Sequence, residues 1–189
     1  MCGIVGYIGK HQAAPIILEG LAKLEYRGYD STGMAVFDGK KINIQKAAGR
    51  LQVLENMTRG GETMPGFVGI GHTRWATHGQ PTDVNAHPHD NKAGTINVII
   101  ENYQQLKKRL LDHGYEFVSD TDTEVLVQLI DYYYKGNPLE AITKVLHRVE
   151  GSYALGILFA DHPEEIFAVR KDCPLIVGTS SEGSFIASD

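Results

Sequence analysis

The sequence lacks several features that would place it in particular classes of protein. It has only two cysteines among 189 residues, and a chain of this length can bury a core without disulfide staples. Its 18 Lys and Arg against 23 Asp and Glu give a net charge of −5, with no basic stripe of the kind that nucleic-acid binders carry. No apolar run approaches the roughly 20 residues of a membrane helix. We therefore expect a single domain that binds neither nucleic acid nor a membrane.

The two ends of the sequence each carry an expectation. The opening Met-Cys-Gly-Ile-Val-Gly has no basic segment of the kind that starts a secretory signal, which favours a cytoplasmic protein with reduced thiols. The sequence stops at Ser188 and Asp189, directly after a strand-like run, which indicates a fragment of something longer.

Apolar periodicity and turn residues predict an α+β domain. Strands are expected at residues 3–8, 34–37, 41–45, 67–72, 95–100, 152–160, 166–169, 175–177 and 184–186. A first helix is expected around Pro15, with Gly28 past its end and with an apolar face of Ile17, Leu18, Leu21 and Leu24. Two more are expected over 51–57 and from an Asn102 cap to about His113. The last two are expected over 125–134, behind a capping box at 121–124, and from Pro138 to Gly151. Clusters of strands and helices, rather than strict alternation, favour antiparallel sheets covered by helices.

Cys2 has an unusual position for a structural cysteine, directly before a predicted buried strand. If Met1 is removed, Cys2 carries a thiol together with a free α-amine whose pKa is about 7.7–8.0. That amine can accept the thiol proton, so one residue would supply both nucleophile and base. The alternative is a small buried hydrophobe, as most free cysteines are, and we assign the other cysteine, Cys173, to the core.

Residues 73–91 form a long irregular segment rich in His, Pro, Asn, Thr and Gly, which is typical of a functional or disordered loop. Arg74 can bind a carboxylate with two parallel hydrogen bonds, and Thr77 and His78 would add donors beside it. The sole tryptophan, Trp75, lies next to this arginine in a stretch too polar for a core strand. The alternative is an exposed arginine on a loop.

The histidines of this segment raise the alternative of a metal site. The Asn-Ala-His-Pro-His run at 85–89 follows His72 and His78, and imidazole suits zinc. There is no cysteine pair, no His-Glu-x-x-His and no helix that would put two histidines on one face. We therefore expect no metal and no cofactor, and assign His87 and its neighbours to a pocket wall.

Two further charged groups could complete a site. The stretch 24–31 contains Arg27 and Gly28 and is either a solvated salt bridge or an arginine and flexible turn beside the Cys2 strand. Asp122, at a predicted helix start, can cap backbone N–H groups or meet an ammonium. In the second case Asp122 and Arg74 would together bind the two charged ends of an amino-acid zwitterion. Composition alone does not decide between these two roles of Asp122.

Six motifs carry a family resemblance: MCGIVGYIG, LEYRGYDS, GHTRWATHG, NAHPH, IIENY and TDTEV. Together they resemble the N-terminal glutaminase domain of the glutamine–fructose-6-phosphate aminotransferases, and the match spans nearly the whole chain. The opening Met-Cys-Gly-Ile is shared widely among class II glutamine amidotransferases. The YRGYDS and TRWATH forms of these motifs resemble the class II amidotransferases of hexosamine synthesis rather than those of purine or asparagine synthesis.

The resemblance implies the N-terminal-nucleophile fold, a four-layer αββα sandwich of two mainly antiparallel sheets, with 1–189 as a glutaminase domain truncated at its C-terminus. It implies that Cys2, once Met1 is removed, attacks the side-chain amide of L-glutamine, forms a thioester and releases ammonia, and that water then releases glutamate. Arg74 would bind the α-carboxylate of glutamine and Asp122 its α-ammonium. The same resemblance gives pocket roles to Trp75, Thr77 and His78 and supporting roles to Arg27, Gly28 and His87.

The resemblance also implies a second half of the enzyme, a sugar isomerase absent from this sequence. There the ammonia would convert fructose 6-phosphate to glucosamine 6-phosphate, and the protein would form a homodimer through that half. The chain alone is therefore expected to hydrolyse glutamine at most.

One departure from the family pattern concerns the oxyanion hole. Before Ile-Ile-Glu-Asn the family has a Val-His-Asn-Gly turn whose Asn side chain and Gly N–H form this hole, whereas here Asn97 and Val98 run directly into Ile99. A true loss removes both donors, and losing a single one typically costs about 10²–10³ in turnover. An alternative alignment puts Asn97 on the family's Asn and Val98 on its Gly, which asks a β-branched residue to replace a glycine in a turn.

Three functional hypotheses follow. The chain is an active glutaminase half, a glutamine-binding module that has lost turnover, or the glutaminase of a sister class II amidotransferase with another acceptor. A chain that keeps Met1 would be inactive whatever its pocket, because the α-amine of Cys2 would lie in a peptide bond.

Overall fold

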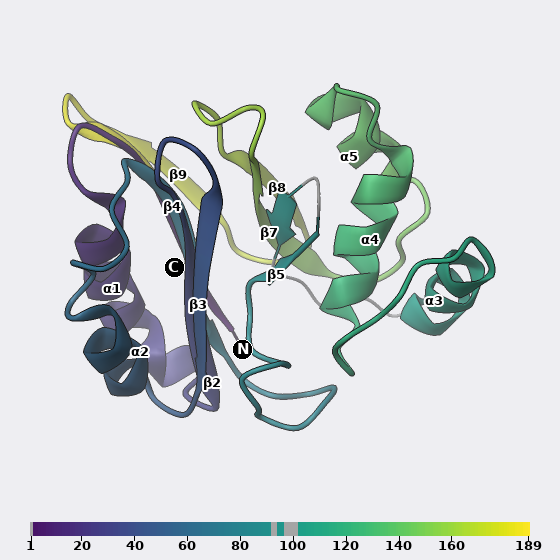
Figure 1. The fold of residues 1–189 in the computed structure, drawn as a ribbon, viewed down its shortest axis with the longest axis horizontal. Coiled ribbons are helices and arrows are strands. Elements are labelled where there is room, and N and C mark those ends of the chain that lie inside the picture. Colours follow the sequence, from purple (N-terminus) through teal and green to yellow (C-terminus); the bar gives the residue numbers. More distant parts are fainter. Residues whose placement is uncertain (1, 92–93, 97–101) are drawn as a thin grey trace.

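The computed structural model of the chain describes residues 2–91, 94–96 and 102–189. They form four layers, with helices on both outer sides and two β-sheets face to face between them (Figure 1). The strand pairs of both sheets are antiparallel, so the expected α+β sandwich of two mainly antiparallel sheets is confirmed.

The larger sheet carries the start of the chain near its centre. Its six strands run in the order β3-β2-β4-β1-β10-β9. They are β1 (Gly3–Gly9), β2 (Ser31–Phe37), β3 (Ile42–Ala48), β4 (Val68–Arg74), β9 (Ile176–Thr179) and β10 (Gly183–Ala187). Gly3 pairs with Thr73, so the residue before β1 lies beside the end of β4. This register brings Cys2 next to the segment that follows Arg74.

The smaller sheet has four strands in the order β5-β6-β7-β8. They are β5 (His89–Asp90), β6 (Gly94–Ile96), β7 (Tyr153–Phe159) and β8 (Phe167–Lys171). Between the two sheets, Ala35, Val68 and Ile70 of the larger sheet pack with Leu158 of β7. This apolar contact fixes how the two sheets face each other.

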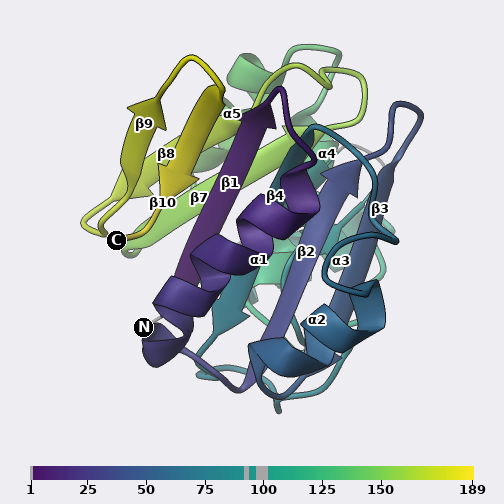
Figure 2. The ribbon, with the colours of Figure 1, turned by 90° about the vertical axis from the view of Figure 1, so that its left-hand side faces the viewer.

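Two helices cover the outer face of the larger sheet. α1 (Ala13–Leu24) and α2 (Leu51–Thr58) lie over β1, β4 and β2, as Figure 2 shows. The predicted apolar face of α1 is confirmed, since Ile17, Leu18, Leu21 and Leu24 are all buried. α1 continues into the short 3-10 turn η1 (Glu25–Arg27), and Gly28 follows it.

Three helices cover the outer face of the smaller sheet. They are α3 (Tyr103–Asp112), α4 (Thr123–Tyr133) and α5 (Pro138–Leu146). α4 is the central one, and its Val125, Leu126, Leu129 and Ile130 are buried against the neighbouring helices and β7. None of the helices in the described ranges combines the length and apolarity that crossing a bilayer requires.

Most expected elements are confirmed, but several of their limits differ, as in β2, which begins at Ser31, and β3, which ends at Ala48. α5 ends at Leu146, well before Gly151. β4 extends through Arg74 and β5 occupies His89–Asp90, so the irregular segment is shorter than expected. Of the strand expected at 95–100, only Gly94–Ile96 is described; positions 97–101, where the oxyanion turn would lie, fall outside the described residues.

The assignment of Cys173 to the core is wrong. The residue is half-buried, because it lies in the turn between β8 and the edge strand β9, whose four residues are all exposed. Its neighbour Asp172 has a φ of +58°, which marks the turn there.

Candidate functional site

Cys2 lies at the start of β1, beside the end of β4. The Trp75 N–H donates to its Sγ at 3.4 Å, and the thiol donates to the Trp75 carbonyl oxygen at 3.8 Å. Burial raises the pKa of the half-buried thiol, while the hydrogen bond with Trp75 and the charge of Arg74 act in the opposite direction. The thiol is therefore protonated at neutral pH, and a reaction at this sulfur needs a base.

Arg74 is the last residue of β4 and is only 3% exposed. Its Nη2 donates to the carbonyl oxygens of His78 and, at 3.1 Å, of Gly79, so the following loop curls around the guanidinium. Its Nη1 is buried and makes no hydrogen bond to the residues that the structure describes. A buried charged donor without a partner is costly. The guanidinium also influences the pKa of Cys2, so this nitrogen can receive a carboxylate placed near the sulfur.

Asp122 precedes α4 and is 3% exposed. Its side chain does not cap the helix, although it occupies the N-cap position. Its negative charge acts to raise the pKa of Cys2 and that of Arg74, so it lies within electrostatic reach of both. A sulfur, a guanidinium and a carboxylate from distant parts of the chain thus lie within electrostatic reach of one another.

The capping box expected at 121–124 is wrong. Glu124, which is 1% exposed, reaches further back along the chain than a capping box does. It accepts hydrogen bonds from the N–H groups of Val118 at 2.9 Å and Ser119 at 2.6 Å, and from the Ser119 hydroxyl at 2.6 Å. Glu124 therefore ties the turn before α4 to the helix, and Asp122 is carried by that turn.

Residues 27 and 28 pack against the site. The Nε of Arg27 donates to the carbonyl oxygen of Cys2 at 3.1 Å. A Cβ on Gly28 would lie 2.6 Å from the carbonyl carbon of Arg74 and 2.7 Å from the nitrogen of Trp75. Only glycine fits this close approach, so Gly28 has a packing reason beyond ending a helix. The stretch is not a solvated salt bridge, although Arg27 also pairs with Asp189 at 3.2 Å.

The residues after Arg74 differ from the expected donors. Thr77 and His78 are exposed, and the loop contacts the guanidinium through backbone carbonyl oxygens. Trp75 is 44% exposed, and its ring packs edge-on against Tyr29 with ring centres 5.7 Å apart.

His72, His87 and His89 form a buried cluster near Arg74. The ring centre of His87 lies 4.6 Å from that of His72 and 4.9 Å from that of His89. Burial lowers the pKa of His72 and of His89 to about 3 and holds that of His87 well below its usual range, and the charges of Arg74 and Lys46 act in the same direction on His87 and His89. The rings are therefore neutral at physiological pH. No three His, Cys, Asp or Glu side chains in the described ranges are arranged to hold a metal ion.

Sequence reasoning missed three polar residues that organise the site: Asp30, Asn85 and Glu124. Asp30 donates its N–H to the Arg74 carbonyl oxygen at 3.0 Å and accepts from the Ala76 N–H at 2.9 Å. The partners of Asp30 and Asn85 are distant in sequence, and Glu124 was predicted to close a capping box rather than to bind the turn before it. Only the position of Asn85 at the head of the Asn-Ala-His-Pro-His run could have drawn attention to it.

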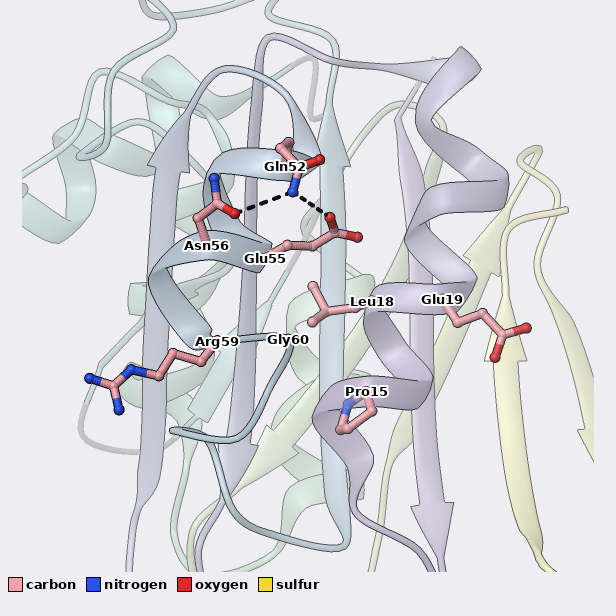
Figure 3. Close-up of a pocket in the computed structure, with 8 residues that line it drawn as sticks. All are labelled: Pro15, Leu18, Glu19, Gln52, Glu55, Asn56, Arg59 and Gly60. Carbon is pink, nitrogen blue, oxygen red and sulfur yellow. Dashed lines mark hydrogen bonds between the residues drawn. The ribbon is translucent and has the colours of Figure 1, made fainter.

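A separate groove of about 620 Å³ lies between α1 and α2 on the outer helical layer (Figure 3). It is lined by Pro15, Leu18, Glu19, Gln52, Glu55, Asn56, Arg59 and Gly60. In Figure 3, Gln52 donates to Glu55 and Asn56. The lining contains no thiol and no imidazole, so this groove is distinct from the Cys2 site.

Comparisons with known proteins agree with this geometry. Residues 73–189 match the family described as "Glutamine amidotransferase domain". The chain is 58% identical over its whole length to "Glutamine--fructose-6-phosphate aminotransferase [isomerizing]" from Clostridium acetobutylicum, and equally to that from Clostridium tetani. Each alignment covers 193 positions, four more than the 189 residues of this chain, and the chain spans 32% of the length of these curated relatives.

Among solved structures, the fold is similar to that of glutamine phosphoribosylpyrophosphate amidotransferase from B. subtilis. The TM-score is 0.86 at 27% identity, over 99% of this chain and 42% of that one. The resemblance found in the motifs is confirmed, and the part of the relatives that matches is their N-terminal glutaminase region. The chain therefore belongs to the glutamine amidotransferase domain family.

Proposed function

We propose that residues 1–189 act as one glutaminase unit that hydrolyses the side-chain amide of L-glutamine, with Cys2 as the nucleophile. The observation that carries the proposal is the buried Nη1 of Arg74, which has no hydrogen-bond partner among the described residues and belongs to a guanidinium within electrostatic reach of the Cys2 sulfur. A carboxylate bound there would give this nitrogen its missing partner. Family membership supports the same assignment.

The substrate is an amino acid held at both ends. Arg74 binds the α-carboxylate and Asp122 the α-ammonium, while the side-chain amide extends towards Cys2. Trp75, Thr77 and His78 shape the pocket mouth. Arg27 holds the Cys2 backbone through its carbonyl oxygen, Gly28 lets the chain pack against Arg74 and Trp75, and His87 supports the wall behind Arg74.

The chemistry follows from the raised pKa of the thiol. After Met1 is removed, the α-amine of Cys2 accepts the thiol proton, and the sulfur forms a bond to the amide carbon. The C–N bond breaks, and the leaving nitrogen takes the proton and departs as ammonia. Water then attacks the thioester carbon, the C–S bond breaks, and glutamate leaves as the thiol re-forms.

The relatives are named for a transfer to fructose 6-phosphate. We propose that ammonia from this site serves the synthesis of glucosamine 6-phosphate in a longer cytoplasmic protein of amino-sugar metabolism. That protein would contain a sugar-isomerase half, through which it would form a homodimer.

A second candidate is a glutamine-binding module without turnover. It is favoured by the sequence before Ile99, where the family's Val-His-Asn-Gly turn is lacking, and by the four extra positions in the alignments with the relatives. If both oxyanion donors are absent, turnover should fall by more than the factor of about 10²–10³ that a single donor supplies.

Replacing the nucleophile tests the proposal, and the second cysteine provides a matched control. We expect Cys2→Ala to abolish the release of glutamate and ammonia from glutamine, and Cys173→Ala to leave it near the wild-type rate. Intact mass spectrometry first establishes that Met1 has been removed. Hydrolysis by Cys2→Ala at the wild-type rate would refute the assignment, and calorimetric binding of glutamine without turnover would favour the second candidate.

A further inference from the structure

Arg74 and Asp122 lie on separate parts of the chain, and the buried side chain of Asn85 connects them. Asn85 is 2% exposed and opens the Asn-Ala-His-Pro-His run, and the proposed chemistry gives this asparagine no role. Its Oδ1 accepts from the N–H of Asp120 at 3.0 Å. Its Nδ2 donates to the carbonyl oxygen of Gln80 at 3.0 Å and to the Asp120 carboxylate at 3.3 Å.

These hydrogen bonds complete a short series of contacts between the Arg74 guanidinium and the segment that carries the Asp122 carboxylate. On one side, Gln80 follows Gly79, whose carbonyl oxygen accepts from Arg74 at 3.1 Å. On the other side, Asp120 lies two residues before Asp122 in sequence. A displacement of Asn85 would therefore change the distance between the guanidinium and the carboxylate.

The loop segments at Gly79 and Asn85 are held in place by close packing and by hydrogen bonds. Gly79 has a φ of +81°, and a Cβ there would lie 2.9 Å from the Nδ2 of Asn85 and 3.2 Å from the Cβ of Asp120. The loop that carries Asn85 is also fixed to the larger sheet, because Asp83 accepts from the Ala48 N–H at 2.7 Å.

The turn that carries Asp122 is fixed independently. Thr121 Oγ1 bonds to Nε2 of His89 at 2.8 Å and to the Ser119 hydroxyl at 2.9 Å, and Ser119 is held by Glu124. A turn tied at these points moves as a unit, so what happens at Asp120 reaches Asp122.

We infer that Asn85 is a positioning residue that sets the span between Arg74 and Asp122, and so selects ligands that carry both an α-carboxylate and an α-ammonium. This inference rests on the proposed function, in which those two groups hold the two ends of glutamine. It gives the Asn-Ala-His-Pro-His run a role in specificity.

The test compares two ligands that differ only at the α-carbon. L-Glutamine carries the α-ammonium, and glutaramate, its deamino analogue, does not. Their dissociation constants are measured by calorimetry on a Cys2→Ala parent, which prevents turnover. A charge-assisted contact to Asp122 predicts that the parent binds glutamine about tenfold to a hundredfold more tightly than glutaramate.

Asn85→Ala should lower this ratio by about tenfold while the dissociation constant of glutaramate changes by less than about threefold, because that ligand needs Arg74 alone. Asp120→Ala changes an exposed side chain and keeps the backbone bond to Asn85, so it should lower the ratio by a smaller factor. Asn56→Ala, on the exposed surface of α2, serves as the control and should leave the ratio unchanged.

Two results would overturn the inference while the proposed function stands. One is an unchanged ratio in both Asn85→Ala and Asp120→Ala. The other is an equal weakening of both ligands in Asn85→Ala, which would indicate general damage to the pocket. A parent that binds neither ligand would refute the proposed function itself, and the inference with it.

Discussion

Gly28 lies where the backbone after η1 passes against the end of β4. A Cβ there would meet the Arg74 carbonyl carbon at 2.6 Å and the Trp75 nitrogen at 2.7 Å, and backbone atoms cannot rotate away as a flexible side chain can. Because the Trp75 N–H donates to the Cys2 sulfur, a shift of this backbone also moves the hydrogen-bond partner of that sulfur.

We therefore expect Gly28→Ala to destabilise the fold by about 1–3 kcal/mol and to weaken glutamine binding. Gly178→Ala is the control, because a Cβ there meets nothing within 4 Å, and its effect should stay within about 0.5 kcal/mol. Urea unfolding and calorimetry measure the two effects. Equal stability of the two variants would show that the backbone can yield at Gly28.

At this scale, the sequence allowed some residues to be predicted and not others. Cys2 could be singled out because its chemistry depends on its place in the chain, and Arg74 because its neighbours are polar. Asn85 could not, since only the fold brings its partner Asp120 near, and the role of Glu124 was predicted as a capping box although it binds the turn five and six residues before it. Cys173 was misassigned because a half-buried turn and a core strand have the same local composition.

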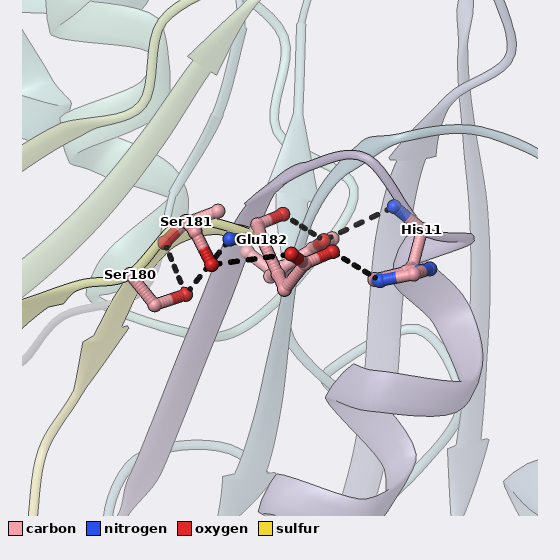
Figure 4. Close-up of polar contacts among 6 residues, drawn as sticks. His11, Ser180, Ser181 and Glu182 are labelled. Atoms are coloured by element: carbon pink, nitrogen blue, oxygen red, sulfur yellow. Dashed lines mark hydrogen bonds and ion pairs between the residues drawn. The ribbon is translucent and has the colours of Figure 1, made fainter.

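At the scale of elements, the β9–β10 hairpin is joined to the segment before α1 at Glu182 and His11 (Figure 4). The buried side chain of Tyr7 and a backbone bond from the Lys10 N–H to the Glu182 carbonyl oxygen make this connection. Tyr7 is fully buried, its hydroxyl donates to the Glu182 carbonyl oxygen at 3.0 Å, and it accepts from the His11 N–H at 3.1 Å. Figure 4 also shows the contact between the His11 ring and the Glu182 carboxylate, at 3.0 Å.

We expect Tyr7→Phe to lower the free energy of unfolding by about 1–2 kcal/mol, because the His11 N–H loses its acceptor and the Glu182 carbonyl oxygen keeps only the bond from the Lys10 N–H. His11→Ala removes only the contact between side chains that are 60% and 53% exposed, and should cost less than about 1 kcal/mol. Denaturant unfolding of both variants checks the order. A larger loss in His11→Ala would show that the ion pair holds the hairpin.

Strands and helices were predicted more reliably than their ends. The apolar faces of α1 and α4 depend on periodicity along one segment, which the sequence shows directly. Whether a polar side chain caps a helix depends on whether it binds the N–H groups of that helix or groups elsewhere in the fold. Asn102 occupies the N-cap of α3, yet its amide binds the Arg148 carbonyl oxygen at 2.8 Å and the Glu150 N–H at 3.1 Å, and so joins α3 to the segment after α5.

At the scale of the whole molecule, the sandwich encloses uncharged imidazoles. His72, His87 and His89 lie in or beside strands of both sheets and are 2–4% exposed, so the folded chain excludes water from all three. The motif resemblance implied the four layers but gave no reason to expect this cluster. The pKa of each ring is lowered by the burial that the two sheets create together, which no local segment shows.

This cluster makes the stability of the fold depend on pH. In the unfolded chain a histidine titrates near pH 6.5, whereas folded His72 and His89 titrate at about 3. Between these values the unfolded state binds more protons, so stability falls as the pH falls below 6.5, by about 1.4 kcal/mol per pH unit for each histidine. More than about one unit above pH 6.5 the histidines are deprotonated in both states, and the three rings contribute no pH dependence.

Urea unfolding at pH 5, 6, 7 and 8 measures this slope directly. His87→Phe keeps a ring in place and removes one titrating group, so its slope below pH 6.5 should be shallower than that of the wild type. Leu139→Ala, which replaces a 64% exposed side chain on α5 and changes no titrating group, should keep the wild-type slope. A stability that is flat from pH 8 to pH 5, or an unchanged slope in His87→Phe, would mean that the buried rings can take up protons without disturbing the sheets around them.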